Sequence, residues 1–265
     1  MAASWPAGVG RELHAVLDST SAEAMRLAAG GESGPLWILA ERQTAARGRR
    51  SRAWASPQGN FAASLLYRPE DDIGRFALRS FTAALALHDA LAAATGAAQL
   101  LTLKWPNDVL LADRKLAGIL LEATTPVGGA PVLVIGVGVN LRSAPPSATL
   151  EPGAVPPTSL IAETGCSLAP EALLDRLAPA LERWERRLVA EGFAPVREAW
   201  LARAARIGQR ATARLAAHEI TGVFETVDAE GALVLRTDAG RQSVAAADLH
   251  FPPEPWEAGA DAARH

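Results

Sequence analysis

Cysteine is almost missing from this sequence of 265 residues, in which Cys166 is the single example. One thiol cannot form an intramolecular disulfide, and a zinc site of the cysteine type needs several thiolates. Cys166 also lies outside every motif considered below. The composition therefore excludes a disulfide scaffold and a cysteine-ligated metal centre. It fits the reducing cytoplasm, where we expect the protein to be located.

Long apolar runs are lacking as well. The longest stretches, such as PVLVIGVGVNL, fall well short of the roughly 20 apolar residues that a membrane helix needs, so we interpret them as buried strands. The N-terminus has no basic stretch followed by an apolar run and a small-residue cleavage site, so we expect no secretory signal. We therefore expect no membrane partner.

The sequence also lacks a large excess of either charge. The 26 lysines and arginines nearly balance the 29 aspartates and glutamates, for a net charge of −3. Such a chain has no overall electrostatic attraction for nucleic acid, and any basic site must be local. We expect no nucleic-acid partner.

Apolar periodicity predicts a mixture of helices and strands. Thr20 and Glu23 have the spacing of a capping box, which predicts that a helix begins there. Further helices are expected over residues 76–95, 170–191 and 194–206, and strands over residues 36–42, 59–69, 101–105, 107–112, 116–124 and 132–142. A tight turn is expected at Asp113-Arg114. The order of elements indicates an α+β fold, with a mixed or antiparallel sheet flanked by helices.

The pattern changes at Ile207 to short alternating segments separated by turn signals at residues 228–231 and 238–240. This predicts a small C-terminal β-barrel of the SH3-like kind. We therefore expect a catalytic domain over residues 1–206, the barrel over residues 207–252, and a disordered Pro-rich, acidic tail over residues 253–265.

Arginines are concentrated at positions 42, 47, 49, 50 and 52, of which the first immediately precedes the loop QTAARGRRSRAW and the other four lie in it. The planar guanidinium donates paired hydrogen bonds to anionic oxygens, so the loop is suited to bind phosphate. Gly48 allows a close approach of the backbone to a ligand, and Trp54 could order the loop around it. A solvated basic loop is the simpler alternative. A nucleic-acid-binding loop is less favoured, because no aromatic platform or recognition helix accompanies it.

The segment KWPNDVLLADRKLAG places Lys104, Asp108 and Lys115 on adjacent expected strands, with Gly118 leaving room above the sheet. Two lysines and an aspartate suit a site that handles a carboxylate and a phosphate together. Taken singly, each residue has a structural alternative: Asn107 and Asp108 favour turns, and Lys115 could be a solvated hairpin residue.

Together these segments resemble the signatures of biotin–protein ligases. The match includes QTAARGRRSRAWASPQGN, KWPND with RKLAGILLE, IGVGVN with Gly136, Gly138 and Asn140, DST near the N-terminus and, more weakly, PPTSL. Their order holds across about residues 13–165. Two positions depart from the family pattern: Ala46 stands where glycine is usual, and Ser21 where asparagine is usual.

The resemblance implies ATP-dependent biotinylation of one lysine on a biotin carboxyl carrier domain, by way of biotinyl-5′-AMP. It implies that the catalytic residues are Lys115, Arg47, Arg49 and Asp108. It implies that biotin is bound by Ser19, Thr20, Ser21, Gln43, Arg47, Gly48, Arg49, Lys115 and Gly118. The implied nucleotide-binding residues are Arg47, Arg49, Arg50, Trp54, Lys104, Asn107, Lys115 and Asn140. No residue is assigned to a metal, and Mg²⁺ is expected to bridge the ATP phosphates.

Three alternatives remain at this point. A lipoate–protein ligase or octanoyltransferase also modifies a carrier lysine. A dinucleotide-binding oxidoreductase could be argued from GVGVN, although a third glycine and a following helix are missing. A nucleic-acid-binding regulator would need a helix-turn-helix domain, and only about a dozen residues precede the segment that resembles the catalytic domain. A homodimer is possible.

Overall fold

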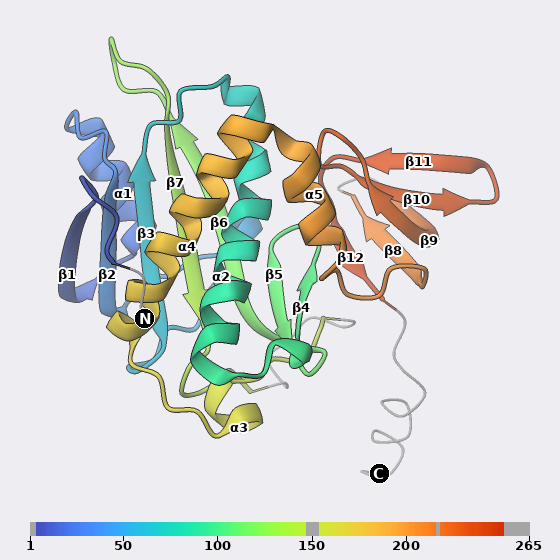
Figure 1. Cartoon of the computed structure of the whole chain (residues 1–265), viewed down its shortest axis with the longest axis horizontal. Coiled ribbons are helices and arrows are strands. Elements are labelled where there is room, and N and C mark those ends of the chain that lie inside the picture. Colours follow the sequence, from blue (N-terminus) through green and yellow to red (C-terminus); the bar gives the residue numbers. More distant parts are fainter. Residues whose placement is uncertain (1–3, 147–153, 216–217, 252–265) are drawn as a thin grey trace.

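The computed structural model describes residues 4–146, 154–215 and 218–251, which form two sheets and their helices (Figure 1). The tail expected over residues 253–265 lies outside this range. The strands of the large sheet are β1 (Gly10–Leu17), β2 (Leu36–Gln43), β3 (Phe61–Tyr67), β4 (Leu101–Lys104), β5 (Asp108–Leu111), β6 (Arg114–Thr124) and β7 (Val132–Val139). The small sheet contains β8 (Arg210–Arg214), β9 (Glu219–Val227), β10 (Leu233–Thr237), β11 (Gly240–Val244) and β12 (Asp248–His250).

The α-helices are α1 (Thr20–Ala29), α2 (Arg79–Thr95), α3 (Leu160–Thr164), α4 (Pro170–Glu191) and α5 (Phe193–Leu201). Short 3-10 helices are η1 (Arg49–Ser51), η2 (Ile73–Leu78) and η3 (Ala98–Leu100). Over the described parts of the chain, no helix combines the length and apolar character required to cross a membrane.

The large sheet has the order β1-β2-β3-β7-β6-β5-β4. Its β1–β2 pair is parallel and every other neighbouring pair is antiparallel. The small sheet is antiparallel, in the order β11-β10-β9-β8-β12. The expected α+β class with a mixed sheet is therefore confirmed.

The two faces of the large sheet are covered unequally. Helices α2, α4 and α5 lie on one face, where Trp37 and Leu39 of β2 enter the main core (Figure 1). On the other face, α1 covers only Ile38, Leu66 and their neighbours. Because side chains alternate along a strand, one strand supplies both faces.

Strand β7 explains why the second face is left open beyond α1. Val132 and Val134 pack beneath α1, and the next residues on the same face are Gly136 and Gly138. Gly118 of β6 lies directly beside Gly138. Glycines provide no side chain to fill the space above the sheet, so this face has a cavity beside the N-terminal end of α1.

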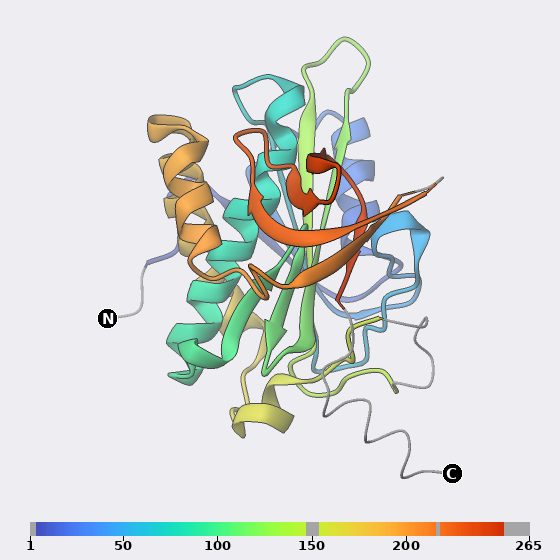
Figure 2. The same ribbon diagram turned by 90° about the vertical axis from the view of Figure 1, so that its right-hand side faces the viewer.

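The small sheet curls against the end of the large sheet (Figure 2). Its apolar residues, including Phe224 and Leu233, belong to the same core as the large sheet. Trp105 donates a hydrogen bond from Nε1 to the carbonyl of Gly231 at 3.1 Å, and Arg197 on α5 donates to the carbonyl of Val227. The position of the domain boundary at residues 206 and 207 stays a prediction.

Several element ends differ from the expectations. The cap of α1 is Ser19, which accepts a hydrogen bond from the Ala22 amide, rather than Thr20. The turn before β6 is made by Ala112 and Asp113, both with positive φ, so Arg114 already belongs to the strand.

Helix α5 ends at Leu201, not at the expected residue 206. The chain beyond it pairs with β4, since Leu103 exchanges backbone hydrogen bonds with Arg203 and Ala205. Helix α3 and strand β1 are further elements that the expected ranges do not include.

Arg79 is fully buried and should be a main determinant of stability. It pairs with Asp71 at 2.8 Å and with Glu185 of α4 at 2.7 Å. Replacing it as Arg79→Met should lower the free energy of unfolding by about 3 kcal/mol, because it leaves carboxylates unpaired in a largely buried position. Urea denaturation measures this loss.

Arg75→Met is the matched control. Its guanidinium is half exposed and lies 3.7 Å from the same Asp71, so the loss should be under about 1 kcal/mol. Equal losses in the two variants would contradict the role given to Arg79.

Candidate active site

A cavity of about 640 Å³ opens on the glycine-lined face of the large sheet. It gathers residues that are far apart in the sequence, from the loop after β2 to strand β12. The predicted site residues that line it are Ser19, Thr20, Ser21, Gln43, Arg47, Gly48, Arg49, Trp54, Lys104, Asn107, Asp108, Lys115, Gly118 and Asn140. Arg50 is the one predicted site residue that does not line it.

The floor of the cavity depends on two glycines. A Cβ atom at Gly138 would lie 2.6 Å from Nε1 of Trp54, and one at Gly136 would lie 2.6 Å from the hydroxyl of Ser21. These distances are far below any normal contact, so a side chain at either position would displace Trp54 or Ser21 from its place above the sheet. The motif IGVGVN therefore makes room above a strand. Residues 140–146, the described segment after β7, contain no helix, so the motif does not lead into the helix that a dinucleotide-binding turn needs.

Hydroxyl and amide groups meet at one end of this floor. Ser64 of β3 donates to Thr20 Oγ1 at 2.8 Å and lies 3.1 Å from the hydroxyl of Ser21. The side-chain carbonyl of Gln43 accepts from the Thr20 backbone amide at 2.8 Å. Ser64 is fully buried and was missed by sequence reasoning, because a lone serine in an apolar strand carries no motif.

Charged groups meet at the other end of the floor. Lys104, Asp108 and Lys115 come from β4, β5 and β6, whose pairing brings Lys104 beside Asp108 and Asp108 beside Gly118. Lys115 Nζ lies 2.8 Å from Asp108 Oδ1, and Lys104 Nζ lies 3.8 Å from Asp108 Oδ2. Lys104 and Asp108 are both buried. The two lysines and the aspartate thus form the cluster that their expected strands indicated.

Burial sets the protonation behaviour of this cluster. Burial lowers the pKa of Lys104, and the nearby Lys115 and Arg49 cations add to this effect against the attraction of Asp108. Burial alone would raise the pKa of Asp108, but Lys115 and Lys104 outweigh it and hold that pKa below its ordinary value. Asp108 therefore remains a carboxylate at neutral pH.

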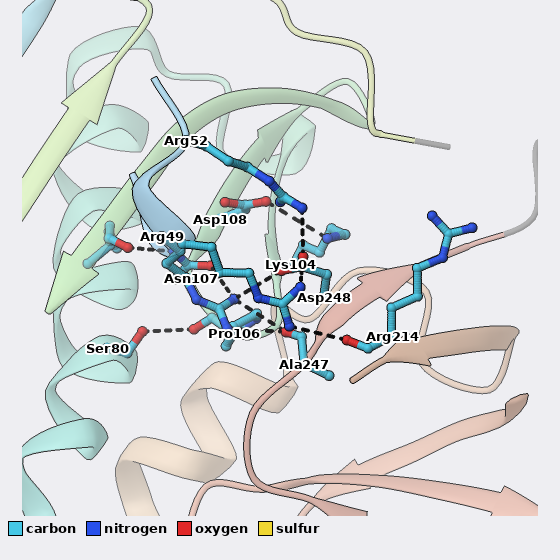
Figure 3. A network of polar contacts seen from close by, with 12 residues as sticks. Arg49, Arg52, Ser80, Lys104, Pro106, Asn107, Asp108, Arg214, Ala247 and Asp248 are labelled. Atoms are coloured by element: carbon cyan, nitrogen blue, oxygen red, sulfur yellow. Dashed lines mark hydrogen bonds and ion pairs between the residues drawn. The ribbon is translucent and has the colours of Figure 1, made fainter. Parts of the chain in front are cut away.

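The loop between β2 and β3 that contains Arg47, Arg49, Arg50 and Arg52 is called the arginine loop below. Carboxylates bind it near both of its ends. Arg47 donates to Glu122 of β6 at 2.8 Å. Arg50 and Arg52 donate to Asp248 of β12 at 2.8 and 2.9 Å. Arg49 lies between these anchors, close to Asn107 and the carbonyl of Ala247 (Figure 3). Burial lowers the pKa of Arg49 despite the nearby carboxylates.

Strand β12 is the main contributor that sequence reasoning missed. Asp248, Leu249 and His250 line the cavity although they lie in the small sheet. The segment PPTSL lies beside the start of β6. The Lys115 amide donates to the Pro156 carbonyl and the Thr158 amide donates to the Lys115 carbonyl, and these bonds stabilise the position of Lys115. Contacts across such sequence distances leave no local signal.

Asn140 directly follows β7 and lines the cavity. It is 2% exposed, and its side-chain oxygen Oδ1 has no hydrogen-bond partner within the structure. A buried acceptor without a partner costs on the order of 1–3 kcal/mol. A ligand that donates a hydrogen bond at this point would remove that cost.

Comparison with known proteins shows the family to which the chain belongs. Residues 14–140 match the biotin/lipoate A/B protein ligase family, and residues 207–249 match the biotin protein ligase C-terminal domain. A biotin–[acetyl-CoA-carboxylase] ligase of Paracoccus denitrificans is 52% identical over 234 residues, which cover 88% of this chain and 97% of that protein. The chain belongs to the biotin/lipoate A/B protein ligase family.

Other family members are more distant. The bifunctional ligase/repressor BirA of Bacillus subtilis is 30% identical over 90% of this chain and 73% of that protein. The structure of biotin protein ligase from Aquifex aeolicus in complex with biotin and ATP superposes with a TM-score of 0.79 at 22% identity. The superposition covers 92% of this chain and 99% of that one, and it supports the fold.

The two departures from the family pattern have simple structural consequences. Ala46 is not among the residues with positive φ, so its backbone does not require glycine. Its carbonyl accepts from the Trp54 amide at 3.0 Å and closes the loop. Ser21 reaches Ser64 across the floor. Both residues line the cavity of this chain.

Asp108 should control the stability of the cluster in a pH-dependent way. In an Asp108→Asn variant, buried Lys104 keeps its charge without a partner, and the free energy of unfolding should fall by about 3 kcal/mol near neutral pH. Asp108 raises the pKa of Lys104 against the effect of burial, so its removal lowers the folded pKa of Lys104 further below the ordinary value of about 10.4. Between these two values the unfolded chain binds more protons, so the stability of the variant rises with pH more than that of wild type. The loss should therefore shrink toward high pH.

Urea denaturation of both proteins near neutral pH and at about pH 9.5 tests this window. Asp113→Asn in the exposed turn before β6 is the matched control and should change stability little at either pH. A loss for Asp108→Asn that is independent of pH would contradict the charge argument.

Proposed function

We propose that the chain is a biotin–protein ligase that uses ATP to attach biotin to one lysine of a biotin carboxyl carrier domain. The observation that carries this proposal is the two-ended cavity. Thr20, Ser21 and Gln43 line it on the Gly136 side of the floor, and Lys104 and Lys115 line it where they pair with Asp108, beside Gly118. Biotin has the same division, with a polar ureido ring, an apolar body and a terminal carboxylate.

The hydroxyl and amide end suits the ureido ring. A buried ureido group needs both donors and acceptors, since each unpaired group costs on the order of 1–3 kcal/mol. Ser19, Thr20, Ser21 and Gln43 provide both kinds of group. The backbone at Gly118 and Gly48 leaves space for the apolar body and tail.

The cationic end suits the first half-reaction. A biotin carboxylate oxygen attacks the α-phosphorus of ATP, the bond to the bridging oxygen of the β-phosphate breaks, and pyrophosphate leaves. Negative charge accumulates around the α-phosphate, and fixed cations stabilise it without reorganisation. In this proposal Arg47, Arg49 and Lys115 act on the reacting groups, and buried Lys104 supports them.

The second half-reaction transfers the acyl group. The amine of the carrier lysine attacks the biotinyl carbonyl carbon, the bond from that carbon to the AMP oxygen breaks, AMP leaves, and the proton of the amine passes to solvent. We infer that Asp108 orients this amine by a hydrogen bond. The lowered pKa of Asp108 makes it a weak proton acceptor, which favours orientation over equilibrium deprotonation.

The nucleotide side of the cavity includes Trp54, Asn107 and Asn140. The unpaired Asn140 oxygen suits a ligand donor such as the exocyclic amine of adenine. Arg50 does not line the cavity, and its bond to Asp248 favours a role in holding the loop over direct contact with the nucleotide. The described residues hold no group of three side chains that could bind a metal ion, so Mg²⁺ is proposed to arrive with ATP as part of the substrate.

A lipoate–protein ligase or octanoyltransferase is the remaining alternative. The dithiolane ring of lipoate and the chain of octanoate offer no strong hydrogen-bond donors to the Thr20–Gln43 end. Such a ring would gain no hydrogen bond from the hydroxyl and amide groups there, whereas a ureido ring can both donate to them and accept from them. The geometry therefore favours biotin.

The remaining parts of the proposal concern setting and partners. We propose a cytoplasmic enzyme that acts on a carrier domain, with no nucleic-acid or membrane partner. A homodimer is compatible with the proposal. We also propose that residues 1–206 form the catalytic domain and residues 207–252 the small C-terminal domain, a division supported by the change of sheet after α5.

Biotin-dependent release of pyrophosphate is the direct test. With MgATP and biotin, the protein should release pyrophosphate and retain biotinyl-5′-AMP, as measured by a coupled phosphate assay and by mass spectrometry. Lipoate and octanoate in place of biotin are the controls. No release with biotin would overturn the proposal, and release only with lipoate or octanoate would establish the alternative.

Separate half-reactions test the role of Asp108. Because it is proposed to orient the incoming lysine, Asp108→Asn should slow acyl transfer by at least about ten-fold more than adenylate formation. Rates are measured below the melting temperature of the variant, with purified biotinyl-5′-AMP and a carrier domain for the transfer step. Equal losses in both steps would show that Asp108 acts only by organising the lysines.

A further inference from the structure

The last strand of the small sheet faces the arginine loop. Strand β12 pairs with β8 on one side only. On its other side lies the loop between β2 and β3, whose Arg49 donates to the carbonyl of Ala247 at 3.3 Å (Figure 3). Two segments about 200 residues apart in the sequence thus form one wall of the cavity.

Asp248 is the charged centre of this contact. One of its carboxylate oxygens accepts from Arg50 at 2.8 Å and from Arg52 at 2.9 Å, and the other lies 3.7 Å from Arg49. The carboxylate side chain is only 13% exposed. A largely buried carboxylate among three guanidinium groups is bound more strongly than an exposed surface pair.

The backbone of the loop reflects the same contact. Arg50 and Ser51 both have positive φ, at 54° and 58°, in the short helix η1. Non-glycine residues adopt this conformation at some cost, so other interactions must stabilise it. The two hydrogen bonds to Asp248, with a third from Arg50 to the Arg214 carbonyl at 3.4 Å, provide them.

We infer that Asp248 is a positioning residue for nucleotide binding. It holds Arg50 and Arg52 against the small sheet, which turns Arg49 toward Asn107 and Lys104 at the cationic end of the cavity. The inference rests on the proposed function and extends it, because it makes the small sheet a working part of the site. Asp248 itself acts through the arginines and does not contact the reacting atoms.

This arrangement also divides the positive charge of the loop. Arg47, Arg49 and Arg52 line the cavity, whereas Arg50 is directed to Asp248. Without the carboxylate, the guanidinium groups would repel one another and the loop would lose its folded form. Nucleotide affinity should then fall, while the biotin end, formed by Thr20 and Gln43, should change little.

The experiment compares Asp248→Asn with Asp248→Glu and with Glu219→Gln. Glu219 is the matched control, because it forms an exposed pair with Arg214 at 2.8 Å in the same sheet. For Asp248→Asn we expect KM for ATP to rise roughly ten-fold, because the variant loses a charge-assisted hydrogen bond that orders the loop. KM for biotin should stay within about two-fold of the wild-type value. Asp248→Glu should recover most of the loss, and Glu219→Gln should behave as wild type.

Limited trypsin digestion gives a readout that does not depend on activity. Cleavage within residues 47–52 should be roughly ten-fold faster in Asp248→Asn than in wild type, as followed by mass spectrometry. A double-mutant cycle completes the test: in an Arg50→Gln/Arg52→Gln background, Asp248→Asn should add less than about two-fold to KM for ATP.

The outcomes separate this inference from the proposed function. If wild type forms no biotinyl-5′-AMP, the proposed function fails, and the trypsin result still decides whether Asp248 holds the loop. Unchanged KM for ATP and unchanged cleavage in Asp248→Asn would overturn the inference. If Asp248→Asn raises KM for ATP as much in the Arg50→Gln/Arg52→Gln background as in wild type, the inference is also overturned. Should Asp248→Asn fold poorly, the same comparison is made with Asp248→Glu and the arginine variants.

Discussion

The compensation of buried charge around Asp108 is the interaction on which the site depends. Lys104 could not remain buried at the end of β4 without a carboxylate close to it, because burial of an unpaired cation is strongly unfavourable. Asp108 provides that carboxylate and also holds Lys115 at 2.8 Å. The pairing of β4, β5 and β6 brings the three groups together, so the geometry of the sheet sets the electrostatics of the cavity.

The space beside this cluster comes from small side chains. Gly118 and Gly138 are neighbours in the sheet, and Trp54 packs against the surface that they leave. The same strands carry large apolar residues on the opposite face, where α2 and α4 cover them. Strands β6 and β7 therefore contribute large side chains to the core on one face and form the floor of the cavity on the other.

The arginine loop connects the two sheets. Glu122 of β6 holds Arg47, and Asp248 of β12 holds Arg50 and Arg52. The loop is thus ordered by carboxylates from both sheets, and its charge is partly neutralised before any anionic ligand arrives. An anion entering the cavity would compete with these carboxylates, so the affinity of the site depends on contacts with the small sheet as well as on the loop itself.

The sequence alone determined those features that depend on residues close together in the chain. Alternating apolar residues predicted the strands, and KWPND with RKLAG placed Lys104, Asp108 and Lys115 on adjacent ones, because neighbouring strands joined by tight turns pair with each other. Only the tertiary structure decided the roles of Ser64, Glu122 and Asp248. Each lies in an ordinary strand, and its partner is fixed by the pairing and packing of distant segments, which no local pattern encodes. The same reason separates Arg50, directed to Asp248, from Arg49, directed to the cavity, although the two are adjacent in the sequence.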